Sequence, residues 1–327
     1  MRNHMLRAAV FFAVLLILLA AASYVLQPKN NTETAGIHDP DANGILAEPE
    51  NTIDVLFLGD SEAYCAFAPL EIWQEQGITS YVCSTTDQKM YQTEEFLRSA
   101  FRNQSPKIVI LETHILYRDY GRTDAISQKA EQLLPVFRYH NRWKSLRAKD
   151  WYAPVQYTGI RRDKGFHLVR TVAAADTTGY MEPSEDTAPI PSKNITHVKN
   201  ILSFCRERGA TLVLVSSPST LNWNSMRHNS VSALAEELGI SYLDLNLMPR
   251  EVPIDWERDT LDHGDHMNFI GAQKVSRYLG RRLSETGLFE DKRPLEAYAP
   301  WNRMLEDYLE DVANIPQAQA TDPGPGS

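Results

Sequence analysis

The sequence predicts an α/β fold, a three-layer α/β/α sandwich around a parallel sheet of the flavodoxin-like type, with an inserted lobe and an N-terminal transmembrane helix. Three patterns support this. Short apolar runs alternate with segments of helical periodicity, which is typical of parallel sheets covered on both faces. The alternation stops between residues 115 and 190, and the chain begins with a 19-residue uncharged run, Ala8–Leu26.

The composition indicates one main domain with appendages. The chain has 327 residues, of which 43% are hydrophobic and 23% are charged, and these are ordinary globular values. The net charge of −9 argues against nucleic acid as a partner, because phosphate binding needs a clustered basic surface.

The N-terminal run is long enough to cross a bilayer. Arg2 and Arg7 precede it, so we expect residues 1–26 to form a cytoplasmic stub and a membrane anchor, with the rest outside the cytoplasm. A cleaved signal peptide is the alternative, since Ala20-Ala21-Ala22 resembles a cleavage site. Residues 27–50 read as a linker, and residues 51–290 as the main domain.

The elements of this domain follow from periodicity and from glycine stops at the ends of helices. The expected strands are 53–58, 78–83, 108–111, 211–216 and 241–245. The expected helices are 70–76, 88–103, 192–208, 228–238 and 271–283.

Residues 115–190 are expected to form an insertion over the carboxyl edge of the sheet. They carry many aromatic rings among basic residues, including His140, Arg142 and Trp143, which suits either a polymer-binding wall or a small core of their own. Residues 291–327 should hold a surface helix within 294–312 and a disordered tail.

The first strand leads through Gly59-Asp60 to Ser61, at the start of a helix. Ligands collect at the carboxyl ends of parallel strands, and a helix start presents unpaired N–H groups. Ser61 is therefore a candidate nucleophile whose own N–H can face an oxyanion, although a helix cap is the simpler alternative. Cys65, one turn later, is a second candidate. Cys65, Cys83 and Cys205 form no metal-binding pattern and cannot all pair in disulfides.

A loop near the end of the domain, Asp262-His-Gly-Asp-His266-Met-Asn268, supplies a base and an acid. His266 is the candidate base. Asp262 is our choice for the orienting carboxylate, with Asp265 as the alternative, because neighbouring side chains in extended backbone point apart. Metal binding by this loop is another alternative, with ligands drawn from Asp259, Asp262, His263, Asp265 and His266.

Gly-Asp-Ser after the first strand, and Asp-x-x-x-His-Met-Asn before the last helix, resemble the SGNH/GDSL hydrolase superfamily. Within it the chain is most similar to the membrane-anchored bacterial DltD-like branch, with looser matches at 106–112, 140–143 and 254–256. It departs from the usual Asp-x-x-His spacing by one residue. Members of the superfamily usually complete the oxyanion hole with a Gly after the second strand and an Asn after the third. Both are absent here, where the matching stretches are 84–88 and 112–114. Gln88, Thr85 or backbone N–H groups would have to donate to the oxyanion instead. Glu112 is either structural or part of the site.

This resemblance implies a serine-dependent esterase or O-acyltransferase that needs no cofactor and binds no metal. Its substrate would be an acylated glycan or another acyl ester of a cell-envelope polymer, with acetyl or D-alanyl as the acyl group, and a membrane acyltransferase could be a partner. The alternative is a non-catalytic envelope protein that keeps the fold and binds glycan or a membrane partner; the missing Gly and Asn favour it.

Overall fold

The computed structural model describes residues 2–314, and its contacts divide the chain into two compact units. The anchor unit comprises the residues up to 40 together with 120–159. The sheet unit comprises 41–119 together with the chain from 160 onward.

The sheet unit contains a five-stranded parallel sheet in the order β2-β1-β3-β4-β5, which is the flavodoxin-like order. Its strands are β1 (Val55–Gly59), β2 (Ser80–Ser84), β3 (Ile108–Glu112), β4 (Thr211–Ser216) and β5 (Ser241–Asp244). Every residue of β1, β2 and β3 is buried, as expected for strands covered on both faces. The predicted α/β class is confirmed, and each strand lies within two residues of its expected position.

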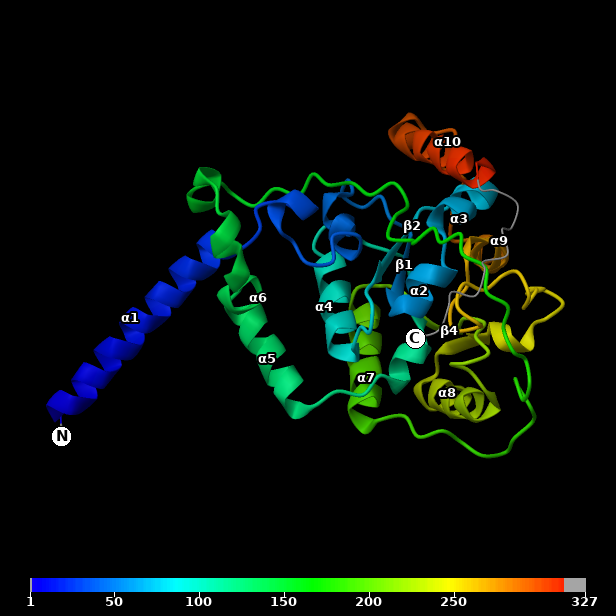
Figure 1. Cartoon of the computed structure of the whole chain (residues 1–327), viewed down its shortest axis with the longest axis horizontal. Helices are drawn as coiled ribbons and strands as arrows, with labels where there is room; N and C mark the ends of the chain where they lie inside the picture. Colours follow the sequence, from blue (N-terminus) through cyan, green and yellow to red (C-terminus); the bar gives the residue numbers. More distant parts are fainter. Residues whose placement is uncertain (1, 315–327) are drawn as a thin grey trace, which may run out of the picture. The chain divides into compact units, whose positions relative to one another are not determined.

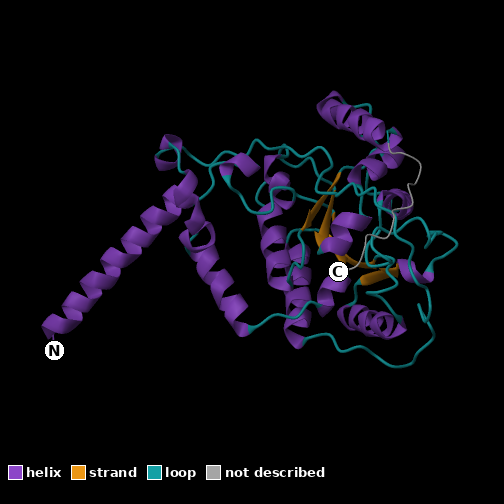
Figure 2. Ribbon diagram, viewed as in Figure 1, coloured by secondary structure: helices purple, strands orange, loops and turns teal. Residues whose placement is uncertain are grey.

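Helices cover both faces of this sheet (Figures 1 and 2). Leu56 and Leu58 of β1 face a core shared with α4, α7 and α8, whereas Val55 and Phe57 face a core shared with α2 and α9. The helices of this unit are α2 (Ser61–Ala66), α3 (Pro69–Gln76), α4 (Met90–Ala100), α7 (Ser192–Glu207), α8 (Ser225–Leu238), α9 (Phe269–Glu285) and α10 (Ala299–Ala313), with 3-10 turns at Ala42–Ala47, His114–Tyr117, Leu245–Leu247 and Glu296–Tyr298.

The expected linker over 27–50 is wrong in both halves. Residues 27–40 belong to the anchor unit, where Asn31 is buried and its side chain donates to the Gly159 carbonyl at 3.1 Å, and the residues after 40 belong to the sheet unit. Ala42 and Ile45 are each 1% exposed and belong to the core of the sheet unit. Glu48 forms a buried ion pair with Lys164, with Oε1 2.8 Å from Nζ. The composition of this segment suggested a loop, but its few apolar side chains are enough to dock it. The sheet unit therefore begins near residue 41 rather than 51.

The expectation of one inserted lobe over 115–190 also needs correction. Residues 120–159 group with the N-terminal helix, while the chain from 160 onward runs along the sheet unit. The Val82 N–H donates to the Lys164 carbonyl, and the His167 N–H donates to the Tyr64 carbonyl, so this second part is held by long-range backbone hydrogen bonds. Such bonds leave no periodic pattern in a sequence.

The anchor unit is built on α1 (Arg2–Leu26), which is long and apolar enough to be a membrane span or a signal sequence. Its other elements are α5 (Arg122–Leu133), α6 (Val136–Tyr139) and 3-10 turns at Glu33–Ala35, His140–Ser145 and Ala148–Trp151. Only the last turn of α1 packs within this unit: Ser23 and Leu26 are buried, whereas most of the preceding side chains are exposed.

The expected C-terminal helix is present as α10. It is not a free surface helix, because Trp301 and Tyr308 are buried and the Tyr308 hydroxyl donates to Glu71 Oε1 of α3 at 2.9 Å. The expected disordered tail, which begins at residue 316, lies outside the described residues.

Candidate active site

The candidate site lies where the strand order reverses, between β1 and β3. In open α/β sheets this crevice, at the carboxyl ends of the strands, is the usual ligand site. Ser61 opens α2 directly after β1, and Glu112 ends β3. The two strands approach closely at Gly59, where an added Cβ would lie 2.8 Å from the Glu112 Cβ and 2.6 Å from the Ala63 Cβ. Only glycine fits at this point of the turn.

Ser61, His266 and Asp262 form one hydrogen-bonded chain. The Ser61 Oγ lies 2.8 Å from His266 Nε2, and His266 Nδ1 lies 2.6 Å from Asp262 Oδ2. Residues 205 positions apart are thus brought together as the sequence motifs predict. The arrangement allows His266 to accept the serine proton while the carboxylate holds its Nδ1–H.

Asp262 and Asp265 both approach the imidazole, but differently. Asp262 accepts from Nδ1 with one oxygen and from the His266 backbone N–H with the other, at 2.6 and 2.7 Å. The nearest Asp265 oxygen is 3.6 Å from Nδ1, beyond a hydrogen bond, and Asp265 instead accepts from the Asn222 amide. The geometry therefore favours Asp262 as the orienting group.

The pKa of His266 responds to opposing effects. Burial lowers it, but the hydrogen bond to Asp262 and the charges of Asp265 and Asp262 outweigh burial, so the pKa is raised above its usual value of 6.5. A base with a raised pKa is a stronger proton acceptor but is neutral over a narrower pH range.

Two loops hold the histidine in place. In the loop after β4, Ser219 Oγ donates to the carbonyls of Gly264 and Asp265, each at 2.9 Å. Gly264 has φ +96°, and an added Cβ there would lie 2.0 Å from Thr220 Oγ1. Asn268 then caps α9, accepting from the Ile270 N–H at 3.0 Å and donating to the Arg258 carbonyl at 2.7 Å. Asn268 of this motif therefore has a structural role, because it joins the start of α9 to the backbone at Arg258.

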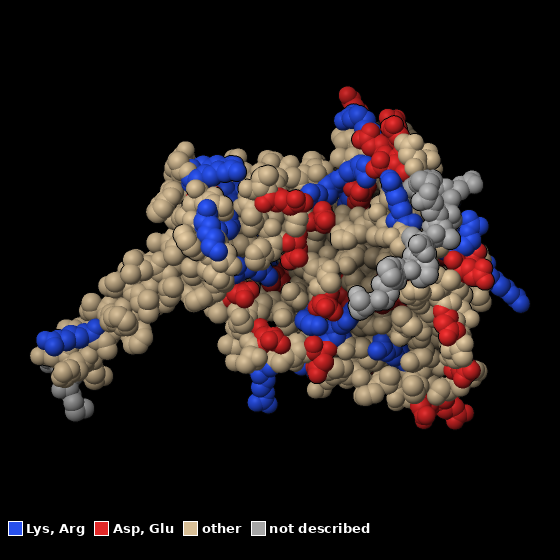
Figure 3. Space-filling view, viewed as in Figure 1, with Lys and Arg blue, Asp and Glu red and all other residues tan. Residues whose placement is uncertain are grey.

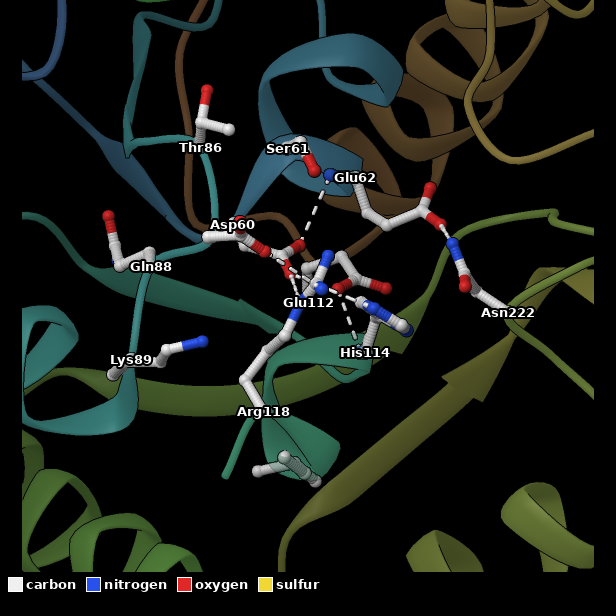
Figure 4. Close-up of polar contacts among 12 residues, drawn as sticks. Asp60, Ser61, Glu62, Thr86, Gln88, Lys89, Glu112, His114, Arg118 and Asn222 are labelled. Carbon is white, nitrogen blue, oxygen red and sulfur yellow. Dashed lines mark hydrogen bonds and ion pairs between the residues drawn. The ribbon is translucent and has the colours of Figure 1, made fainter. Parts of the chain in front are cut away.

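Three buried carboxyl groups lie near Ser61: Asp60, Glu112 and Glu62, whose side chain points toward Asn222 (Figure 4). Asp60 accepts from the Glu62 N–H and from Arg118 Nε, at 3.2 and 2.6 Å. Glu112 accepts from the Ser217 hydroxyl at 3.0 Å and the His114 N–H at 2.8 Å. The charge of Asp60 is therefore balanced by Arg118, and Glu112 is embedded in neutral donors.

The pKa values of the other two carboxyl groups are raised. Burial, followed by the charges of Glu112 and Asp60, raises the pKa of Glu62. Burial and the charge of Asp60 raise the pKa of Glu112. Glu62 Oε1 accepts from Asn222 Nδ2 at 2.8 Å, and the same Asn222 nitrogen reaches Asp265. Asn222 thus links the carboxyl cluster to the histidine loop.

Glu62, Asn222 and Arg118 complete this network. Sequence reasoning assigned Glu62 and Arg118 no such role, and it offered Asn222 only as a residue that could line the pocket or belong to a turn. Glu62 follows the candidate nucleophile directly, which is the one available signal. Asn222 and Arg118 come from irregular segments, and nothing in their spacing indicates the contact.

His114 lies in the stretch 112–114, where the sequence resemblance leads us to expect the absent oxyanion Asn. Burial lowers its pKa to about 4, so its ring is neutral at neutral pH. Arg227 donates to Nδ1 at 3.1 Å, which leaves the ring hydrogen on Nε2. Among the described residues, this buried Nε2 has no hydrogen-bond partner.

The other predicted residues are less directly engaged. Gln88 is fully buried, and its side chain bonds Thr85 at 3.2 Å and Thr93 at 2.8 Å; Figure 4 draws it apart from Ser61. An oxyanion role for Gln88 or Thr85 stays a prediction. Cys65 is buried, and burial, with the nearby Glu62 charge, raises its pKa, which disfavours the nucleophilic thiolate.

Two of the five residues considered as metal ligands are engaged in other contacts. Asp259 pairs with Lys274, and His263 Nδ1 contacts the Ala174 carbonyl. Asp262, Asp265 and His266 do lie within 4.8 Å of one another. Both ring nitrogens of His266 are hydrogen-bonded, however, so metal binding would break the contact to Ser61 or to Asp262.

Comparison with known proteins gives distant structural similarity only. No protein-family model matches the chain, and no curated protein matches it. Among solved structures, a GDSL-like lipase from Bacteroides thetaiotaomicron has TM-score 0.36 and 11% identity, covering 78% of this chain and 95% of the lipase. An acetyl xylan esterase has TM-score 0.37 and 12% identity, covering 72% and 99%.

A third solved structure, a catalytic mutant of an acetylxylan esterase from Geobacillus stearothermophilus, has TM-score 0.35 and 12% identity, covering 71% and 94%. Similarity of this degree assigns neither activity nor substrate to this chain.

Proposed function

We propose that this chain is a serine-dependent esterase or O-acyltransferase that acts on acyl esters of a cell-envelope polymer. The observation that carries the proposal is the hydrogen-bonded chain from Ser61 Oγ through His266 to Asp262, with 2.8 and 2.6 Å between successive partners. The helix-cap alternative for Ser61 is wrong, because Asp60 caps α2 by accepting from the Glu62 N–H at 3.2 Å. A histidine on the serine hydroxyl is what a nucleophile needs.

In the proposed reaction, Ser61 Oγ attacks the acyl carbonyl and its proton passes to His266 Nε2. Asp262 stabilises the imidazolium without taking the proton. His266 then gives the proton to the leaving alcohol, and the acyl group stays on Ser61. Water, activated by His266, completes hydrolysis; a hydroxyl of an acceptor polymer would complete transfer in the same way.

The oxyanion would be held by the backbone N–H of Ser61 and by the Nε2–H of His114. His114 supports this role because it lies in the stretch 112–114 that matches the absent Asn and carries its hydrogen on Nε2. Among the described residues this nitrogen makes no hydrogen bond, and its ion-pair neighbour, Asp60 Oδ2, is 3.8 Å away. Loss of one such donor costs on the order of 3 kcal/mol, or a hundredfold or more in rate.

The cell location is part of the proposal. We propose that α1 stays as a single-pass anchor with the sheet unit outside the cytoplasm, because basic residues precede the apolar run. This would bring the esterase to membrane-linked polymers, and a membrane acyltransferase would be a natural donor of acyl groups.

The test uses the full chain in detergent with p-nitrophenyl acetate, beside Ser61→Ala and His266→Ala. Ser203→Ala, an exposed serine on α7, is the matched control. We expect hydrolysis in the wild type and the control, and its loss in the two site variants with folding intact. Equal rates in all four proteins would instead favour a non-catalytic envelope protein.

The acyl group needs a second assay. Release of acetate from an O-acetylated polysaccharide, or of D-alanine from a D-alanyl ester, separates the two proposed classes. Transfer is distinguished from hydrolysis by following a labelled acyl group into an added acceptor polymer.

A further inference from the structure

The anchor unit carries an unusual surface next to the outer end of α1. Trp143, Trp151 and Tyr152 are 66%, 63% and 74% exposed. Large aromatic side chains of this kind are normally buried in a soluble unit, whereas Trp and Tyr gather where a protein meets the membrane interface.

Hydrogen bonds tie this surface to the last turn of α1. Arg142 Nη1 donates to the Leu26 carbonyl at 2.6 Å, and the Tyr24 hydroxyl donates to the Ala153 carbonyl at 3.3 Å. Trp143 directly follows Arg142, and Tyr152 directly precedes Ala153. The exposed rings therefore belong to segments that contact the helix end.

The length of α1 indicates how deep these segments would lie in the membrane. The uncharged run from Ala8 to Leu26 spans about 28 Å as a helix, close to the hydrocarbon thickness of about 30 Å. With this run across the membrane, Leu26 lies at the outer hydrocarbon boundary. Groups bonded to its last turn then lie in the headgroup layer, which is several ångströms deep.

Charge on this unit has the sign that suits anionic lipids. The stretch 138–149 contains five basic residues and no acidic one, although the whole chain has a net charge of −9. Figure 3 shows Lys and Arg side chains gathered over this helical part and almost no charge along α1 beyond its start. A basic segment beside a membrane span attracts anionic headgroups.

A small cavity lies within the same unit. It has a volume of about 170 Å³, and its lining includes Lys29, Arg142, Arg147 and Lys149, with Asp150 as the acid. Asp150 pairs with Arg142 at 3.1 Å, which leaves three cationic side chains in excess. Among the described residues, the buried Arg142 Nε has no hydrogen-bond partner. Clustered N–H donors of this kind suit a phosphate group.

We propose that residues 136–153 of the anchor unit bind the surface of the membrane that α1 crosses, with Trp143, Trp151 and Tyr152 in the headgroup layer and the phosphate of an anionic phospholipid in the Lys29–Arg142 cavity. This rests on the proposed anchor and is independent of the ester chemistry. The lobe would hold the first residues after α1 against the bilayer instead of leaving a free tether.

Tryptophan fluorescence of the full chain in phosphatidylcholine nanodiscs tests the docking. The chain has six tryptophans, none of them in α1, and Trp73, Trp223 and Trp301 are buried. Lipids brominated near the headgroup should quench part of the emission. The Trp143→Phe/Trp151→Phe variant should lose most of the quenchable part, and Trp223→Phe should keep it. Equal quenching in all three proteins, or none in the wild type, overturns the proposal.

The cavity is tested by comparing brominated phosphatidylglycerol with brominated phosphatidylcholine at equal fractions. We expect brominated phosphatidylglycerol to quench the tryptophan emission several-fold more strongly than brominated phosphatidylcholine. Arg147→Gln/Lys149→Gln, at exposed positions, should remove the difference, whereas Arg250→Gln/Arg281→Gln, an exposed pair in the sheet unit, should keep it.

No preference for the anionic lipid, or a preference that excess inorganic phosphate removes, contradicts a lipid site. Fluorophosphonate labelling of the same nanodiscs reports separately on Ser61, so failure of the docking and failure of the esterase proposal are distinguishable.

Discussion

Replacing Asp262 by Asn should disable the site through the tautomer of His266. In the structure, one Asp262 oxygen accepts from the His266 backbone N–H and the other from Nδ1, at 2.7 and 2.6 Å. An Asn has a single oxygen. If it keeps the backbone N–H bonded, its NH₂ group faces Nδ1, which must then be the unprotonated nitrogen. The hydrogen moves to Nε2, which can no longer accept the Ser61 proton.

The expected loss in kcat/KM for p-nitrophenyl acetate is about 10³- to 10⁴-fold, or about 4 to 5.5 kcal/mol, as for a triad locked in the wrong tautomer. Asp265→Asn is the matched control. Its oxygen is 3.6 Å from Nδ1, so we expect a loss of less than about tenfold. Equal losses in the two variants, or a greater loss in Asp265→Asn, would refute the assignment of Asp262.

Three further predictions concern pH and stability. The net effect of burial, Asp262 and Asp265 raises the pKa of His266. The value of kcat/KM should therefore rise with pH with an apparent pKa above 6.5. An apparent pKa below 6.5 would contradict this role of His266. Glu48→Gln leaves buried Lys164 without its charge partner, so urea unfolding should show a loss of about 3 to 5 kcal/mol, and Glu50→Gln, on an exposed neighbour, almost none. Burial and the charge of Asp60 raise the pKa of Glu112. Above pH 4.5, the usual pKa of a glutamate, the unfolded chain loses this proton while the folded chain keeps it, so the Tm should fall as the pH rises. Glu112→Gln resembles the protonated side chain, so its Tm should fall less over the same pH range.

The sheet could be predicted because its signals are local. Apolar runs of strand length and glycine stops after helices gave all five strands, and β4 has the expected bounds, Thr211–Ser216. Such patterns reflect burial on both faces, which every residue of a central strand experiences.

The routes of the irregular segments could not be predicted. Residues 41–48 join the core through two apolar side chains and one ion pair, and the chain near Lys164 is held by a backbone bond to β2. The composition of both segments is that of a loop, and the residues that they contact are far away in the sequence. The division of 115–190 at Gly159 has the same cause.

The site could be predicted only in part. Ser61 and the 262–268 loop carry motifs, so their meeting follows from the resemblance and from the topology. The contact of Asn222 with Glu62 depends on where the loops after β4 and β3 cross. So does the position of His114 Nε2, which makes no hydrogen bond among the described residues. No spacing in the sequence encodes that crossing.

Every role proposed at this site depends on Ser61 acting as a nucleophile that His266 activates. The most direct measurement treats the full chain with a fluorophosphonate probe and maps the adduct by peptide mass spectrometry. We expect one adduct, on Ser61, which His266→Ala forms much more slowly and Ser203→Ala forms at the wild-type rate. An unlabelled Ser61 in the folded wild-type chain, or labelling at the same rate without His266, would contradict it.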